Sequence, residues 1–200
     1  PKTWQGGASL SVFDIKADLA AVLDALGHDI DKLQVVAEPP AWAHPGRGGR
    51  VQLGPTNIIA WFGELHPAWA EALDISGPVA GFELDLDAVP EPRRKPTRAK
   101  PALKLSDLMP VERDYAFLVD RDMPAATLLR AARGADKTLI ADVAVFDLFE
   151  GKGVAEGKKS IAIRVTLQPI ARTLTDEDID KVSAAIVGAV GKATGGTLRG

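Results

Sequence analysis

The sequence predicts an α+β fold in two parts, joined by a stretch that can form neither helix nor strand. Alternating apolar and polar residues predict strands, and apolar residues at three- and four-residue steps predict helices. Between residues 90 and 101 the chain has four prolines and five basic residues, and prolines at this density exclude a regular element. We therefore predict one domain over residues 1–92, a linker over 93–105 and a second domain over 106–200. The linker is either a solvated strap or a basic contact for a phosphate backbone.

Short predicted elements follow one another in the first part. A helix is predicted over residues 10–27, because apolar residues recur at helical spacing up to Gly27, a common stop signal. Residues 41–50 are rich in glycine and proline, which predicts a loop. The remaining predicted elements are a strand over 33–37, a hairpin of 51–53 and 57–62 around Gly54-Pro55, a helix after Pro67 and a strand over 82–87.

The second part predicts six elements in the order βαββαβ. The clearest is a helix that begins after Thr175, a good N-cap, with Asp178 three residues on and an acidic first turn. The elements are strands over 111–119, 139–149, 159–168 and 196–199 and helices over 124–133 and 175–190. This order is that of the ferredoxin-like fold, so we expect a sheet that buries one of its two faces.

The composition limits the partners that the chain can bind. Its 200 residues are 46% hydrophobic with a formal net charge of −3, so it can build a core but is no polybasic nucleic-acid binder. Any nucleic-acid contact must be a local patch. The lack of cysteine excludes disulfides and thiolate metal sites, and no apolar run reaches the ~20 residues of a membrane helix. The chain starts at Pro1 without a signal peptide, and we interpret it as a piece of a longer protein.

Two strands of the second part carry a set of polar residues on one face. Side chains of a strand alternate between its two faces. On the first strand one face carries Ala144, Phe146 and Leu148, and the other carries Val143, Val145, Asp147 and Phe149. On the second strand the apolar row is Ile161, Ile163, Val165 and Leu167, and the opposite row is Ser160, Ala162, Arg164 and Thr166.

This polar face is suited to holding an unstacked nucleic-acid base. Phe149 offers a ring for stacking, the small Ala116 of strand 111–119 leaves room beside it, and Asp147 and Ser160 can hydrogen-bond to a base edge. The basic residues that could meet phosphate are Arg164, Lys158 and Lys159. The alternative is a sheet face that is covered by another domain or simply faces water.

Two other groups are weaker candidates for a site. His44, His66 and Glu64 could in principle bind zinc, but their spacing matches no metal motif, and histidines that hydrogen-bond within turns explain them more simply. The glycine-rich residues 46–50 could cradle a phosphate or could lead into the predicted hairpin.

Residues 106–200 contain four motifs, namely VERDYAFLVD at 111–120, VFDLFEG at 145–151, EGKKSIA at 156–162 and RTLTDED at 172–178. With these motifs the segment resembles the ferredoxin-fold anticodon-binding domain of bacterial phenylalanyl-tRNA synthetase β subunits. Residues 1–92 are similar to the end of the catalytic-like domain of the same subunit, a mixed domain of class II synthetase shape. That likeness lies in residues 13–16 (FDIK), 44–47 (HPGR) and 63–67 (GELHP).

The resemblance implies the C-terminal portion of a phenylalanine–tRNA ligase β subunit. The whole enzyme would be a cytoplasmic (αβ)2 tetramer that attaches phenylalanine to tRNA(Phe) with ATP and Mg²⁺. The α subunit would hold the synthetic site, so this piece would be non-catalytic and would bind no cofactor or metal. Its second domain would bind the anticodon, with the wobble guanine stacked on an aromatic ring.

The family's contact positions fall on four residues of this sequence, namely Ala116, Asp147, Phe149 and Ser160. The family often has tyrosine where Phe149 stands, so the stacking surface is kept and the hydroxyl is lost.

Two other functions are compatible with the pattern alone. A ferredoxin-like module could sense a small ligand at a dimer edge, or both domains could hold partner subunits without binding RNA. An independent hydrolase is not supported, because the sequence has none of the nucleophile or zinc motifs of that class.

Overall fold

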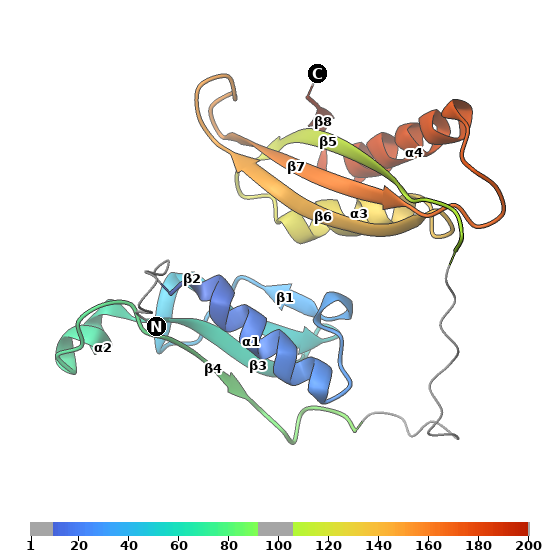
Figure 1. The fold of residues 1–200 in the computed structure, drawn as a ribbon. Coiled ribbons are helices and arrows are strands. Elements are labelled where there is room, and N and C mark those ends of the chain that lie inside the picture. Colours follow the sequence, from blue (N-terminus) through green and yellow to red (C-terminus); the bar gives the residue numbers. More distant parts are fainter. Residues whose placement is uncertain (1–9, 92–105, 200) are drawn as a thin grey trace, which may run out of the picture. The chain divides into compact units, whose positions relative to one another are not determined.

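A computed structural model of the chain describes residues 10–91 and 106–199, and each of these ranges forms its own compact unit (Figure 1). Each unit has its own four-stranded sheet and its own core. The predicted linker over 93–105 lies outside the described residues. Within the two described ranges, no helix has the length and hydrophobicity of a membrane span.

The first unit packs one long helix on an antiparallel sheet. Helix α1 (Val12–Ala25) ends at Gly27 as predicted, because the positive φ of 86° lets the N–H groups of Gly27 and His28 reach carbonyls of the last helical turn. Leu19 and Leu23 of α1 are buried against the sheet. The strands of the sheet are β1 (Gln34–Val36), β2 (Ala43–Leu53), β3 (Asn57–Leu65) and β4 (Ala80–Leu84). The short helices η1 (Ile30–Lys32) and α2 (Pro67–Ala72) lie in the connections.

The loop predicted over residues 41–50 is wrong, because strand β2 runs through most of it. The glycines here allow neighbouring backbones to approach closely. A Cβ at Gly48 would lie 2.6 Å from the carbonyl oxygen of Phe62, and one at Gly49 would lie 2.6 Å from that of Val36. The pairing with β3 also slips between Ala43 and Gly48. The composition that indicated a loop thus belongs to a bulged, tightly packed strand.

The predicted βαββαβ order is confirmed in the second unit. Its elements are β5 (Val111–Asp120), α3 (Ala125–Ala135), β6 (Ile140–Phe149), β7 (Lys158–Leu167), α4 (Asp176–Thr194) and β8 (Thr197–Leu198). The strands pair antiparallel in the order β6-β7-β5-β8. The predicted cap of α4 is present, since the N–H of Asp178 donates to Thr175 Oγ1 at 3.3 Å and the N–H of Thr175 donates to Asp178 Oδ2 at 3.0 Å.

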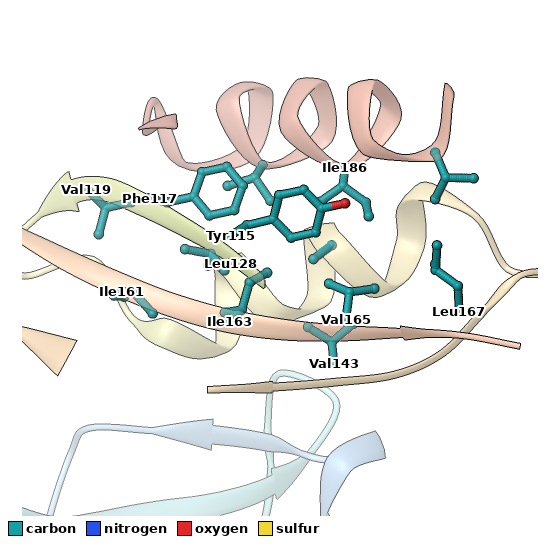
Figure 2. Packing of buried hydrophobic residues seen from close by; sticks show 13 residues of the cluster. Tyr115, Phe117, Val119, Leu128, Val143, Ile161, Ile163, Val165, Leu167 and Ile186 are labelled. Atoms are coloured by element: carbon teal, nitrogen blue, oxygen red, sulfur yellow. The ribbon is translucent and has the colours of Figure 1, made fainter. Parts of the chain in front are cut away.

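One face of this second sheet is buried beneath both helices. Figure 2 shows the rings of Tyr115 and Phe117 pointing from β5 toward α4. The hydroxyl groups of Tyr115 and Ser183 lie 2.7 Å apart. The polar group of the Tyr115 ring is therefore hydrogen-bonded. The predicted apolar row of the second strand is confirmed, because its four members are fully buried: Ile161, Ile163, Val165 and Leu167.

The predicted faces of the first polar strand are partly wrong, because β6 contains a bulge. Val145 pairs with Ile163 and Asp147 pairs with Ala162, so Phe146 is an extra residue that reverses the alternation. The side chains on the helix side are Val143, Val145 and Leu148, and those on the other side are Ala144, Asp147 and Phe149. Without the bulge, strict alternation would place Val143 on the same face as Asp147 and Phe149, outside the core. In the structure Val143 is fully buried in the core.

Candidate nucleic-acid interface

Two rows of side chains cross the open face, by which we mean the face of the second sheet opposite α3 and α4. Residues directly paired across antiparallel strands share a face, so the register aligns them. The first row is Phe149, Ser160, Leu118 and Thr197. The second row is Asp147, Ala162, Ala116 and Arg199. The four residues that the sequence predicted as base contacts therefore lie together, in two neighbouring rows.

Small residues form the floor of the second row. Ala162 of β7 and Ala116 of β5 are direct partners, and both are only partly buried. Because neighbouring strands lie about 4.8 Å apart, Asp147 and Arg199 stand at the two ends of a row about 14 Å long. The short alanine side chains leave space above the sheet between the carboxylate of Asp147 and the guanidinium of Arg199.

The first row supplies an aromatic ring and a hydroxyl. Phe149 is 40% exposed, although a Cβ at Gly151 in the following loop would lie only 3.4 Å from its Cζ atom. Ser160 is 4% exposed between its register partners Phe149 and Leu118. In the described part of the chain its hydroxyl makes no hydrogen bond, so it keeps a donor and an acceptor for a ligand.

Arg199 reaches across the open face toward Phe149. Its backbone N–H donates to the carbonyl oxygen of Ala116 at 2.7 Å, which extends the pairing of β8 with β5 by one residue. Its guanidinium carbon lies 5.8 Å from the centre of the Phe149 ring, within the range of a cation–π contact. The guanidinium also comes close to the loop after β6, since a Cβ at Gly153 would lie 3.9 Å from its Nη2 atom.

Arg164 belongs to an ion-pair cluster farther along the same face. Its Nε and Nη2 donate to the two carboxylate oxygens of Asp114, each at 2.8 Å, and its Nη1 lies 3.6 Å from Glu112. Its guanidinium carbon is 5.3 Å from the centre of the Phe146 ring. The paired hydrogen bonds lower the pKa of Asp114 and raise the pKa of Arg164. The positive charge is therefore already balanced, which makes Arg164 less available to a phosphate.

The two predicted phosphate-binding lysines leave the sheet on opposite faces. Lys158 is on the open face, and its Nζ donates to Asp120 at 2.6 Å. Both side chains of this ion pair are about half exposed, and such pairs exchange partners at little cost. Lys159 pairs in register with the buried Val119, so its side chain starts on the helix side.

The histidines serve local structure. His44 Nδ1 accepts the N–H two residues on at 3.0 Å, and His66 caps α2 by accepting the N–H of Ala68 at 3.2 Å. Glu64 pairs with Arg47 at 2.8 Å. Across residues 10–91 and 106–199, no three His, Cys, Asp or Glu side chains gather as a metal site would require. These contacts support the structural interpretation of the histidines over the zinc site. Residues 46–50, the possible phosphate cradle, are part of strand β2.

Arg199 is a member of the open face that the sequence did not predict. A strand was predicted over 196–199, but its register was not assigned. The signal was present in the two-residue period, because Thr197 pairs with Leu118 on the open face and Arg199 therefore returns to that face.

Comparison with protein families identifies both units. Residues 106–199 match the ferredoxin-fold anticodon binding domain, and residues 1–86 match the phenylalanyl tRNA synthetase beta chain CLM domain. These matches do not favour the small-ligand-sensing alternative.

Curated relatives align with nearly the whole chain. A phenylalanine–tRNA ligase beta subunit of Bradyrhizobium diazoefficiens is 54% identical over 196 residues, covering 98% of this chain and 24% of the relative. The corresponding protein of Paramagnetospirillum magneticum is 56% identical over 192 residues, covering 96% and 24%. That of Mesorhizobium japonicum is 52% identical over 200 residues, covering 100% and 25%. The chain thus spans about a quarter of the length of the curated relatives it matches.

Proposed function

The chain belongs to the family of phenylalanyl-tRNA synthetase β chains, and on this basis we propose that its second unit binds the anticodon of tRNA(Phe) on the open face. One observation carries the proposal. Ala116, Asp147, Phe149 and Ser160 come from three different strands and meet in two adjoining rows on a face that α3 and α4 do not cover. Sequence-specific RNA recognition needs this kind of surface, which stacks an unpaired base and bonds to its edge.

Each of the four residues has a distinct part in the proposed contact. The exposed ring of Phe149 stacks on the wobble base, and Ala116 leaves space at the level of the sheet. Asp147 is exposed, and in the described part of the chain its carboxylate has no hydrogen-bond or ion-pair partner. It can therefore accept from the N–H groups of guanine, while Ser160 donates to or accepts from the same base.

The positive charges near this surface supply the backbone contacts. Of the three predicted phosphate contacts, Lys158 is the most available on the open face, because its ion pair with Asp120 is exposed. Lys159, the second residue of β7, can meet a phosphate that passes the start of that strand. Arg164 would have to leave Asp114 to do so, and we assign it the lesser share.

Membership of this family also supports a proposal about the whole protein. We propose that the full β subunit works in the cytoplasm with an α subunit, as an (αβ)2 phenylalanine–tRNA ligase that uses ATP and Mg²⁺. We assign the synthetic site to the α subunit and no residue of this chain to ATP or Mg²⁺. The contribution of this chain to aminoacylation is to hold the tRNA.

A pair of phenylalanines on β6 provides the first test. Phe149→Ala removes the proposed stacking surface, which is worth ~1–3 kcal/mol per base, so affinity for a fluorescently labelled tRNA(Phe) anticodon stem-loop should fall roughly 5- to 150-fold. Phe146→Ala removes an exposed ring that contacts Arg164 instead. This control should change affinity by no more than about twofold.

The readout is fluorescence anisotropy of the stem-loop against the 200-residue chain. Thermal melting of each variant checks that the fold is retained. Equal affinity of Phe149→Ala and the unchanged chain would overturn the assigned stacking surface, and so would equal losses in the two variants.

A further inference from the structure

We propose that Arg199 forms the second wall of the base site, so that an unpaired base stacks between its guanidinium and the ring of Phe149. The inference deepens the proposed function and rests on it. Its ligand is an unstacked nucleobase, because a planar cation opposite an aromatic ring matches both faces of a flat heterocycle.

The spacing of the two groups is close to what a base requires. Stacked bases lie about 3.4 Å apart, so a base held on both faces needs its two walls about 7 Å apart. In the structure the guanidinium carbon is 5.8 Å from the Phe149 ring centre. A base between them therefore needs at least about 1 Å more separation than this distance provides, and rotation about the torsions of the exposed arginine side chain can supply it.

Arg199 differs from Arg164 in the described partners of its charge. In the part of the chain that the structure describes, this guanidinium has no carboxylate partner. The other arginine that stands over a phenylalanine, Arg164, is held by both oxygens of Asp114. Moving Arg199 away from Phe149 thus breaks no ion pair with a described residue, whereas moving Arg164 away from Phe146 would strain its pair with Asp114.

The backbone of Arg199 is held by hydrogen bonding to β5, while its side chain is exposed. Strand β8 approaches β5 closely through Gly196, where a Cβ would lie 2.7 Å from Val119 Cγ1 and 3.0 Å from the carbonyl oxygen of Leu118. The N–H of Arg199 is bonded to Ala116. Preorganisation of this kind lowers the entropic cost of forming the bound state.

The test is a thermodynamic cycle between Arg199 and the base. Its first axis is Arg199→Lys, which keeps the charge but removes the planar surface. Its second axis is a tRNA(Phe) anticodon stem-loop with guanine or with an abasic nucleotide at the wobble position. The matched control is Arg121→Lys, an exposed arginine at the end of β5 that pairs with Glu150. Anisotropy titrations with the 200-residue chain give all affinities.

The clamp predicts a loss that depends on the base. Arg199→Lys should weaken binding of the guanine loop roughly fivefold or more, with an unchanged slope of log affinity against log salt concentration. The Arg199→Lys variant should bind the abasic loop as tightly as the unchanged chain does. The affinity of the Arg121→Lys variant for each loop should equal that of the unchanged chain.

Other outcomes separate the clamp from the proposed function. If Phe149→Ala and the abasic loop both weaken binding but Arg199→Lys does not, the clamp is overturned and the anticodon site stands. If Arg199→Lys weakens both loops equally, Arg199 is a phosphate contact and the clamp is again overturned. If the unchanged chain binds both loops equally, no base is stacked and both proposals fail.

Discussion

At the scale of single residues, one carboxylate at the start of α4 has a strongly shifted acidity. The pKa of Asp178 falls from its ordinary 3.8 to about 2, chiefly because its carboxylate accepts the backbone N–H of Thr175 and, next, because Arg172 donates to it. The group is therefore charged in the folded unit at pH values where it is partly protonated in the unfolded chain.

This shift has a defined pH signature. The folded pKa lies below the unfolded pKa, so the stabilising contribution of Asp178 is complete above about pH 4 and is lost as pH falls toward about 2. We predict that Asp178→Asn lowers the melting temperature at neutral pH and flattens its decline across that window. Circular dichroism melts from pH 2 to 7 measure this. Asp180→Asn, at an exposed position of the same helix, should retain the original profile. Parallel profiles for Asp178→Asn and the unchanged chain would contradict the prediction.

At the scale of elements, the junction of α4 and β8 fixes the edge of the open face. Helix α4 ends at Gly195, whose φ is 66°, and Gly196 then passes so close to β5 that it has no room for a Cβ. Gly188, on the exposed side of α4, has open space around it. Gly196 is therefore required by the close packing against β5, whereas Gly188, eight residues earlier, is not required by packing.

Substitution by alanine should separate these roles. Gly196→Ala should destabilise the chain by about 1–3 kcal/mol, because the new methyl group collides with Val119 and Leu118. Gly188→Ala should stabilise it by about 0.5–1 kcal/mol, since alanine restricts the unfolded chain and favours the helix. Urea unfolding of both variants measures the difference. A Gly196→Ala variant as stable as the original would show that β8 does not lie where we describe it.

The elements also show which features could be predicted from the sequence. The cap at Thr175 and the stop at Gly27 were predictable, because both depend on residues within one turn of the helix end. The bulge at Phe146 was not, because it is defined by pairing with a strand more than ten residues away. The glycines of β2 signal close approach only once β1 and β3 are beside them.

For the candidate site, the sequence predicted the shared face of four residues but not the contacts that their charged neighbours make. Ala116, Asp147, Phe149 and Ser160 were placed on one face from sequence, although strict alternation would also have put Val143 there. The ion pair of Arg164 with Asp114 joins residues 50 positions apart, so only the strand register could reveal it. Arg199 was missed for the same reason.

At the scale of the whole chain, the charge distribution provides little electrostatic attraction for RNA. The formal net charge is −3, so the molecule as a whole does not attract RNA. On the open face, Arg164 and Lys158 are each paired with an aspartate. Backbone attraction is therefore modest, and we expect contacts to the base to supply a large share of the binding free energy.

The most direct test compares two anticodon stem-loops that differ only at the wobble base. The anisotropy of each labelled loop is measured against the 200-residue chain at low and moderate salt. We predict that replacing the wobble guanine weakens binding roughly fivefold or more at both salt concentrations. Equal affinity for the two loops would contradict base recognition on the open face, and no binding of either loop at low salt would contradict the anticodon site itself.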